Sequence, residues 1–390
     1  MYLLTNGKII TEEGILEGYD ILIENDVIEK ISEKGKIKSI GVEKIDVKGD
    51  YIAPGFVDIH SDYIENMASP RPTSIMDFNI SLREAEKVLL NNGITTMFHS
   101  LSFYGLDLFE HKPVRKRENV VKLMDVINKT HNEKHLIRHR FHARVEIDSI
   151  DEVDNIKGYI KAGNVHLLSF MDHTPGQGQY SDIDTYRKIL KGYKNVSDSE
   201  IDEMVEARQN KATITIDVMK EMAELAKEKN IAIASHDDDS AGKIDFVKEL
   251  GASISEFPIT MDVAKIAQKE GMLTIAGAPN VLLGKSHAGN LSAAEAIKEK
   301  CIDILCSDYY PAAMLHSIFK LNEEYGVDLC DAFKFVTINP AKAVKMDTLI
   351  GSIKEGKKAD ILVIEKLDDL PVITSVFVDG KLMSKINYRV

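Results

Sequence analysis

Histidines and carboxylates end several separate apolar stretches of this chain. The first is FVDIHSDYIE at residues 56–65, where Asp58, His60 and Asp62 occupy alternate positions. Alternate side chains of a strand point to one face, so we expect these three to share a face of a buried strand. Buried polar groups are costly unless something binds them, and imidazole with carboxylate is a typical ligand set for a divalent ion. This stretch therefore indicates a metal site, with His60 and Asp62 as ligands and Asp58 behind them.

The same combination recurs at four later stretches. The strand-end residues there are Asp172 with His173, His236 with Asp237, Glu256, and Asp308. A single such aspartate is often a helix cap, but the repetition favours a common site. Nitrogen and oxygen ligands without cysteine suit Zn²⁺, with Mn²⁺ or Fe²⁺ as alternatives, and a catalytic site keeps one position open for water. We predict one or two ions.

The segment RHRFHARVE at residues 138–146 alternates strictly between charged and apolar side chains. Its even positions hold Arg138, Arg140, His142, Arg144 and Glu146. If the odd face packs on helices, the even face lies inside the fold, where guanidinium groups need anions. The planar fork of Arg144, near the strand end, suits a phosphate group. An internal ladder of arginine–carboxylate pairs is the alternative, above all for Arg138 and Arg140.

Two further stretches indicate an anion site. HKPVRKREN at residues 111–119 is a basic cluster that contains Arg115 and Arg117, although a solvated charged surface is an equal alternative. GKSHAGNLSAAEAI at residues 284–297 runs from a glycine turn into a helix, whose first amide groups can receive a phosphate. It lacks the Walker spacing, and Asn290 or Ser292 as a simple helix cap is the alternative.

Apolar strands alternate with helical patterns through the middle of the chain. We count eight strand candidates between residues 54 and 348, which predict a (β/α)₈ TIM-like barrel whose active site forms at the carboxyl ends of the strands. A doubly wound sheet is less favoured because no glycine-rich dinucleotide turn follows an early strand. Residues 181–215 are predicted to be an insertion, which forms either a lid over the site or helices without a functional role. A capping box from Ser197 to Glu200 predicts the start of a helix there.

The sequence pattern at both ends of the chain differs from that of the middle, because it predicts short strands joined by tight turns. Asn6-Gly7 predicts a hairpin, and Asp379-Gly380 predicts another tight turn. We expect residues 1–53 and 349–390 to form one small β-sandwich, separate from the barrel of residues 54–348.

Composition narrows the class of protein. The formal charge of −13 argues against nucleic acid and anionic membranes as partners, and no apolar run approaches the roughly 18 residues of a membrane span. The three cysteines form no C-x-x-C motif, so we interpret them as reduced thiols of a cytoplasmic protein. A homo-oligomer is left open.

Several motifs together resemble a known family. YIAPGFVDIH, the HDD and CSD strand ends, and GSIKEGKKADILVI are similar to the metal-dependent amidohydrolase superfamily, a distorted (β/α)₈ barrel with a small sandwich built from both termini. HSDYIE, DHTPGQGQY, SHDDDS, SEFPIT, GKSHAGNLSA and SDYYPAAML, in this order, resemble one branch, the diphosphatases that act on a ribose 5-triphosphate in phosphonate catabolism.

This resemblance implies roles for particular residues. Asp308 would both bind metal and accept the proton of the attacking water. Glu146 or Asp172 would replace a bridging lysine that is missing from the end of the fourth strand, and His60-x-Asp62 stands where two histidines are common. The implied metal ligands are His60, Asp62, Glu146, Asp172, His236 and Asp308. The implied substrate ligands are Arg115, Arg117, Arg144, His173, Gln177, Gln179, Glu256, Lys285, Ser286, His287 and Asn290.

The implied reaction is hydrolysis of a phosphoanhydride of a phosphorylated ribose, a small-molecule substrate, to the 5-phosphate and diphosphate. Hydrolysis of a C–N bond, as in a deacetylase or a cyclic amidohydrolase, is the alternative enzyme class, and it needs fewer cationic groups. A barrel scaffold without catalysis is the third hypothesis.

Overall fold

A parallel sheet of eight strands forms the centre of the molecule. The computed structural model describes residues 1–38, 40–103, 113–176, 178, 183, 187, 197–284 and 291–389. The strands, each at a predicted position and in spatial order along the chain, are β8 (Phe56–Ser61), β9 (Ile94–Phe103), β10 (Arg138–Glu146), β11 (Leu167–Met171), β12 (Ala232–His236), β13 (Ile254–Glu256), β14 (Leu273–Gly277) and β15 (Ile304–Cys306). The predicted TIM-like barrel is confirmed.

The barrel closes at the level of the predicted site residues. Strands β15 and β8 lie at the two ends of the sheet and meet through an isolated parallel bridge between Ser61 and Asp308. The backbone N–H of Asp62 donates to the Asp308 carbonyl at 3.0 Å, and the N–H of Asp308 donates to the His60 carbonyl at 3.2 Å. The seam therefore brings the ends of the first and last strands together.

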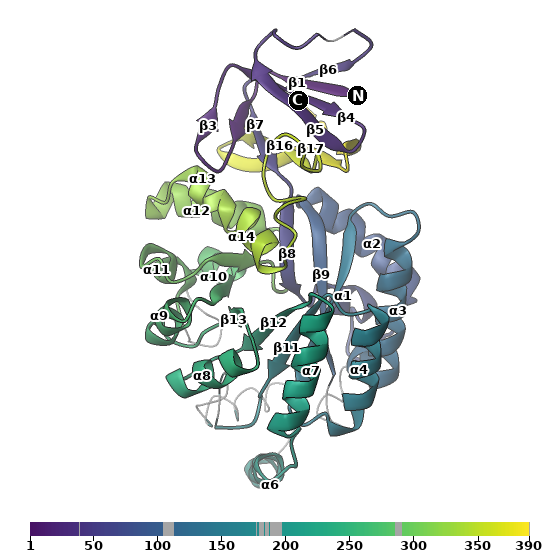
Figure 1. The fold of residues 1–390 in the computed structure, drawn as a ribbon, viewed down its shortest axis with the longest axis vertical. Helices are drawn as coiled ribbons and strands as arrows, with labels where there is room; N and C mark the ends of the chain where they lie inside the picture. Colours follow the sequence, from purple (N-terminus) through teal and green to yellow (C-terminus); the bar gives the residue numbers. More distant parts are fainter. Residues whose placement is uncertain are drawn as a thin grey trace.

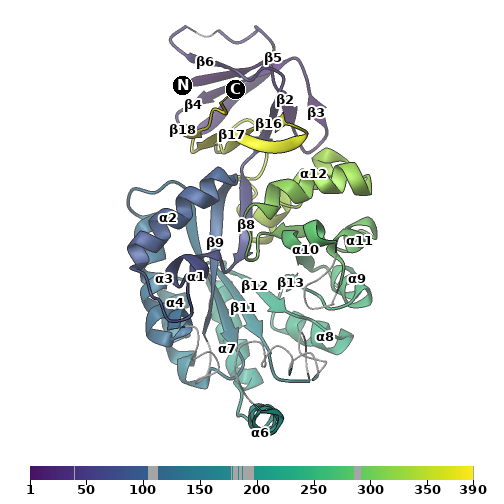
Figure 2. The same cartoon turned by 180° about the vertical axis from the view of Figure 1, so that it is seen from behind.

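Helices cover the outside of this sheet (Figures 1 and 2). They are α1 (Tyr63–Ala68), α2 (Phe78–Asn91), α3 (Arg117–His131), α4 (Val153–Ala162), α6 (Asp198–Gln209), α7 (Ile216–Glu228), α8 (Ala241–Glu249), α9 (Met261–Lys269), α10 (Ala278–Leu283), α11 (Ala293–Lys298), α12 (Ala313–Tyr325), α13 (Leu329–Lys334) and α14 (Ile338–Ala343). Single 3₁₀ turns span Pro113–Arg115 and Ile150–Glu152. One apolar cluster packs between helices and sheet, and a second, which includes Val57, Phe98 and Leu167, fills the barrel.

The predicted insertion is described only in part. Helix α6 begins with the expected capping box, in which Ser197 and Glu200 bond reciprocally to each other's backbone N–H. It projects from the end of the barrel that lies opposite the sandwich formed by the two chain termini (Figure 1). Most of residues 177–196 lie outside the described residues, so a lid stays a prediction.

Strands from both termini form the predicted small sandwich. One sheet holds β1 (Tyr2–Thr5), β4 (Tyr19–Glu24), β5 (Val27–Glu33) and β6 (Glu43–Asp46). The other holds β2 (Lys8–Ile10), β3 (Ile15–Leu16), β7 (Tyr51–Pro54), β16 (Ile361–Leu367), β17 (Leu370–Val378) and β18 (Lys381–Lys385). The boundaries 53/54 and 348/349 stay predictions.

The two turns predicted in the sandwich have different outcomes. Asp379 and Gly380, both with positive φ, join the antiparallel strands β17 and β18. The hairpin predicted at Asn6-Gly7 is wrong, because β1 and β2 belong to different sheets. Here the turn carries the chain across the sandwich, and a Cβ at Gly7 would lie 2.5 Å from Ile52 Cδ1. Local turn chemistry is the same in both cases, but the pairing partners differ.

Arg138 of β10 connects the barrel to the sandwich through a buried cluster of ion pairs. Its guanidinium contacts both oxygens of Asp360, with Nη2 to Oδ1 at 3.1 Å, and it also pairs with Asp379. Arg138 is 7% exposed and Asp360 is 4% exposed. The alternative of an arginine–carboxylate pair therefore holds for Arg138.

Replacing Arg138 by methionine should lower the free energy of unfolding by about 3–5 kcal/mol, because it leaves Asp360 as an uncompensated buried charge. Urea unfolding followed by circular dichroism measures this. Lys265→Ala, at the exposed pair with Glu299, is the control and should unfold like the wild type. An Arg138→Met midpoint equal to that of the control would contradict the assigned role.

Candidate active site

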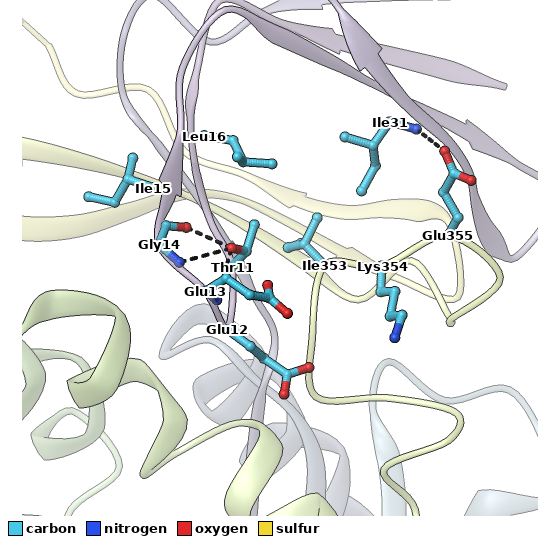
Figure 3. Close-up of a pocket in the computed structure, with 10 residues that line it drawn as sticks. All are labelled: Thr11, Glu12, Glu13, Gly14, Ile15, Leu16, Ile31, Ile353, Lys354 and Glu355. Carbon is cyan, nitrogen blue, oxygen red and sulfur yellow. Dashed lines mark hydrogen bonds between the residues drawn. The ribbon is translucent and has the colours of Figure 1, made fainter.

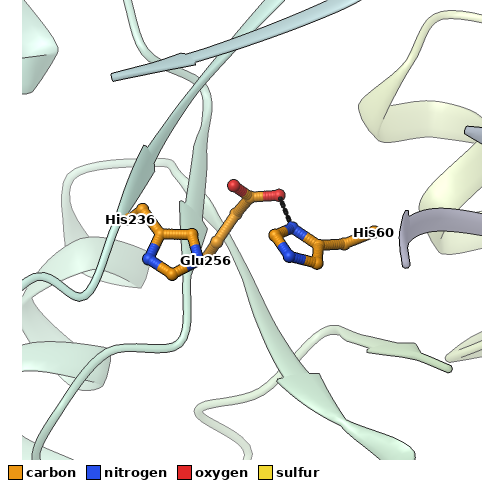
Figure 4. Close-up of side chains that lie close together, drawn as sticks. All are labelled: His60, His236 and Glu256. Carbon is orange, nitrogen blue, oxygen red and sulfur yellow. Dashed lines mark hydrogen bonds and ion pairs between the residues drawn. The ribbon is translucent and has the colours of Figure 1, made fainter. Parts of the chain in front are cut away.

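Three buried side chains at the ends of β8, β12 and β13 point toward one another: His60, His236 and Glu256 (Figure 4). One ligand atom from each lies within 4.8 Å of the others. His60 Nδ1 is 2.8 Å from Glu256 Oε1. The carboxyl ends of all strands in a barrel surround one mouth, so residues of strands that are not all neighbours in the sheet form one group.

A second group shares His236 with the first and adds His173 and Asp237. Asp237 Oδ2 is 2.9 Å from His236 Nδ1 and 3.5 Å from His173 Nε2. The other ring nitrogen of His173, Nδ1, contacts Glu146 Oε1. The described residues thus offer two overlapping groups that could hold a metal ion, and the number of ions stays a prediction.

The chemistry of the first group fits a divalent ion. Glu256 is fully buried, and its Oε2 has no hydrogen-bond partner among the described residues, an arrangement that a bound cation would satisfy. Burial, and secondarily the charge of Arg144, lowers the pKa of His60 well below its usual value. Burial also lowers the pKa of His236 to about 4. Both rings are therefore neutral near pH 7, the form that binds metal.

His173 differs from these two histidines. Burial disfavours its charged form, but Glu146 and Asp237 outweigh burial and raise its pKa to about 9. A protonated His173 has no free lone pair for a metal ion, and its two ring nitrogens face Glu146 and Asp237. The assignment of His173 to substrate stays a prediction.

Four predicted metal ligands belong to neither group of the described residues: Asp62, Glu146, Asp172 and Asp308. Asp62 lies at the start of α1, and its Oδ2 is 3.6 Å from Arg115 Nη2. Asp172 Oδ1 accepts the backbone N–H of Thr174 at 3.0 Å, as in a local turn. Their roles as ligands stay predictions.

The expectation that Asp58, His60 and Asp62 share one strand face is wrong. Asp58 pairs with Met97, and Ser61 pairs with His99, so β8 gains one residue relative to β9 between them. Such a bulge re-aims side chains and breaks the alternation. Asp58 Oδ1 instead accepts the N–H groups of Ser307 at 3.2 Å and His60 at 3.4 Å, which ties β8 to the end of β15.

Asp308 follows β15 at the barrel seam. Burial and then the carboxylate of Asp62 raise its pKa to about 7. Its backbone adopts φ +56°, and Asp237 and Phe257, which follow β12 and β13, adopt +52° and +56°. Left-handed backbone at non-glycine residues is unfavourable and persists only where the surrounding structure holds it.

Arg144 lies beside the first group. Its Nη2 is 3.2 Å from His236 Nε2, and its Nε is 3.1 Å from Met171 Sδ. Arg144 is 9% exposed, and none of the ion pairs among the described residues involves it. A buried guanidinium without a carboxylate is costly, so this position favours an anionic ligand.

The other predicted cations are placed differently. Arg115 Nε donates to Glu65 Oε2 at 2.8 Å, and Arg117 Nε is 2.6 Å from Glu152 Oε1, so both face carboxylates. Arg140 does not point into the barrel as expected, because its Nη1 lies 2.6 Å from His131 Nε2 of α3. The predicted residues Gln177, Gln179, Lys285, Ser286, His287 and Asn290 lie outside the described residues.

The sequence placed Asp237 among the strand-end residues and His142 on the charged face of β10, but neither was given a specific role. The His142 ring contacts Ser100 Oγ at 3.0 Å and Ser169 Oγ at 2.9 Å, and its centroid is 5.3 Å from that of His60. His142 could have been found from its position on the charged face of β10, two residues before Arg144. Asp237 directly follows His236, and that adjacency was its signal.

A pocket of about 580 Å³ lies in the sandwich, away from these residues (Figure 3). Its lining residues are Thr11, Glu12, Glu13, Gly14, Ile15, Leu16, Ile31, Ile353, Lys354 and Glu355. None of them was predicted for the site, and they include no histidine, so the barrel mouth remains the candidate.

A nearly closed parallel barrel with histidines and carboxylates at its strand ends, beside a sandwich from both termini, is the architecture of one large hydrolase class. The model of the Amidohydrolase family matches residues 51–383, and the chain belongs to this family. The NagA composite domain model matches residues 1–52.

Among individual proteins, the chain is similar to the alpha-D-ribose 1-methylphosphonate 5-triphosphate diphosphatase of Escherichia coli K12, with 30% identity over 97% of this chain and 99% of that protein. A dihydroorotase of Staphylococcus epidermidis is 50% identical over 60 residues, 15% of this chain and 14% of that protein. The crystal structure of N-acetylglucosamine-6-phosphate deacetylase from Pasteurella multocida shares the fold, with a TM-score of 0.65, 13% identity, and coverage of 98% of this chain and 99% of that one.

None of the helices in the described part of the chain has the length and apolar character that a membrane span requires.

Proposed function

We propose that this protein is a metal-dependent hydrolase that cleaves a phosphoanhydride of α-D-ribose 1-methylphosphonate 5-triphosphate, yielding the 5-phosphate and diphosphate in phosphonate catabolism. The similarity to the E. coli diphosphatase over nearly the whole of both chains supports the reaction. The structural observation that carries the proposal is Arg144, a buried cation without a carboxylate partner beside the candidate metal ligands.

Each described group has a place in this chemistry. His60, His236 and Glu256 would hold a divalent ion, most simply Zn²⁺, with Mn²⁺ or Fe²⁺ as alternatives. Such an ion lowers the pKa of water and neutralises phosphoryl charge. Asp308 accepts the proton of the attacking water, and Arg144 stabilises negative charge on the phosphoryl oxygens.

The same proposal covers partners and location. The substrate is a small phosphorylated ribose, and the charge of −13 disfavours nucleic acid and anionic membranes as partners. The proposed location is the cytoplasm, in keeping with three cysteines that form no C-x-x-C motif.

A C–N hydrolase is the second candidate. The local similarity to a dihydroorotase favours it, but that similarity covers 15% of the chain. A neutral amide makes no use of Arg144, whereas an anionic C–N substrate such as dihydroorotate would, so the assay below includes anionic C–N substrates. The third hypothesis, a scaffold without metal, leaves the unpartnered Glu256 oxygen unexplained.

One assay separates the three. The full chain, supplied with Zn²⁺ or Mn²⁺, is incubated with ribose 5-triphosphate and, separately, with dihydroorotate and N-acetylglucosamine 6-phosphate. Diphosphate and ribose 5-phosphate formed in equal amounts support the proposal. Amide hydrolysis alone supports the second candidate, and no bound metal with no turnover supports the scaffold.

Replacing His60 by alanine should remove bound metal without unfolding the barrel, because the variant loses one of three ligands that lie close together. Its metal affinity should fall by more than the roughly 10–100-fold lost when a residue that merely supports a ligand is removed. Elemental analysis and circular dichroism measure the two properties. His316→Ala, in α12 and in neither group, should keep its metal. Stoichiometric metal in His60→Ala would argue against the assignment.

A further inference from the structure

A buried carboxylate outside both metal-binding groups lies directly behind two of the candidate ligands. Asp238 is fully buried, and its Oδ2 accepts hydrogen bonds from Ser235 Oγ and Ser255 Oγ, both at 2.5 Å. The two serines face each other in the register of β12 and β13, and so do the next residues, His236 and Glu256. One oxygen atom therefore ties the two strands together one residue before both ligands.

Lys243 of α8 completes this arrangement. Its Nζ donates to the carbonyl oxygens of His236 at 2.7 Å and Asp237 at 3.1 Å, and it lies 3.8 Å from Asp238 Oδ1. The ammonium group thus holds the end of β12 and also compensates part of the charge of the buried carboxylate.

The strand ends need such support. Asp237 and Phe257, which directly follow His236 and Glu256, have φ angles of +52° and +56°. Non-glycine residues keep this backbone only where the surrounding structure holds it. If the two strands shifted, His236 and Glu256 would lose their common orientation toward His60.

We propose that Asp238 is a positioning residue of the metal site, which acts through His236 and Glu256 and does not touch the ion or the substrate. The proposal rests on the metal site of the proposed function, but not on the identity of the substrate. A ligating role for Asp238 itself does not fit, because its Oδ2 accepts two hydroxyl groups, its Oδ1 faces the Lys243 ammonium at 3.8 Å, and it belongs to neither group.

Asp303 provides a matched control. It also joins two neighbouring strands, since its Oδ2 accepts the N–H and the Oγ1 hydroxyl of Thr274, both at 3.0 Å, and its Oδ1 accepts Gln268 Nε2 at 3.0 Å. Thr274 is at the start of β14 and Asp303 precedes β15, so this connection lies at the amino ends of the strands, away from the candidate ligands.

The experiment compares Asp238→Ala and Asp303→Ala in the full chain. Thermal unfolding of metal-free protein should show a loss of stability in both. Zn²⁺ affinity, measured by competition with a chromogenic chelator, should fall about 10–100-fold only in Asp238→Ala. The visible absorption of bound Co²⁺ should change in the same variant, and Asp238→Asn, which keeps an acceptor oxygen, should recover part of the affinity.

Wild-type Zn²⁺ affinity and Co²⁺ absorption in Asp238→Ala, or an equal loss of affinity in Asp303→Ala, would overturn the proposal and leave Asp238 a purely structural group. If Asp238→Ala does not fold, Asp238→Asn and Ser255→Ala decide by the same readouts. A wild type that binds Zn²⁺ but does not cleave ribose 5-triphosphate contradicts the proposed function alone. A wild type that binds no divalent ion overturns both.

Discussion

Replacing Asp308 by asparagine should lower kcat for cleavage of ribose 5-triphosphate by roughly 10²-fold or more, the effect typical of losing a general base. Asp308 lies at the barrel seam, where its backbone bonds to that of His60 and Asp62. Burial and Asp62 raise its pKa to about 7, so it can exchange a proton near neutral pH. An amide of the same size cannot accept that proton. KM should change less than kcat, because the change removes no cation from the site.

A control for the backbone is available at Asp368. Asp308 has a φ of +56° and Asp368, in the turn between β16 and β17, has one of +49°. Asparagine tolerates this region as aspartate does, so both variants should fold and Asp368→Asn should retain full activity. Wild-type turnover in Asp308→Asn would exclude the proton-accepting role. Loss of metal from that variant, measured by elemental analysis, would instead identify Asp308 as a ligand.

Replacing Arg144 by alanine should weaken binding of ribose 5-triphosphate by about 2–3 kcal/mol, or roughly 30- to 150-fold in Kd, as expected for a charge-assisted hydrogen bond in a buried site. The loss should increase from the monophosphate to the diphosphate and the triphosphate, because each added phosphate brings charge that only a cation compensates. Isothermal titration with the three ribose phosphates, against the wild type and Arg144→Ala, measures this series.

Arg140 is the matched control for this series. It lies on the same strand as Arg144, but its guanidinium contacts His131 of α3 and not the residues at the barrel mouth. Arg140→Ala should therefore bind all three phosphates as the wild type does. Equal spacing of the three affinities in wild type and Arg144→Ala would make Arg144 a structural residue and remove the main structural support for a polyphosphate substrate.

Local sequence patterns were sufficient to predict the elements of this fold. Most of the eight barrel strands are short apolar runs, as burial of a parallel strand on both faces favours, whereas β10 alternates charged and apolar side chains. The capping box at Ser197 and the turn at Asp379-Gly380 are equally local, since each depends on residues within a few positions of one another. His60 and His236 were predicted as neighbours because a barrel brings all its strand ends to one rim.

Side-chain partners at that rim depended on contacts between distant segments. His60 and Glu256 are 196 residues apart, and Arg138 and Asp360 are 222 apart, so no periodicity of the chain relates them. The bulge in β8 turns Asp58 away from the expected face, and Arg140 lies toward α3 although it alternates correctly with its neighbours. A strand's own sequence specifies which residues alternate, but the pairing of that strand with its neighbours specifies where each side chain finally points.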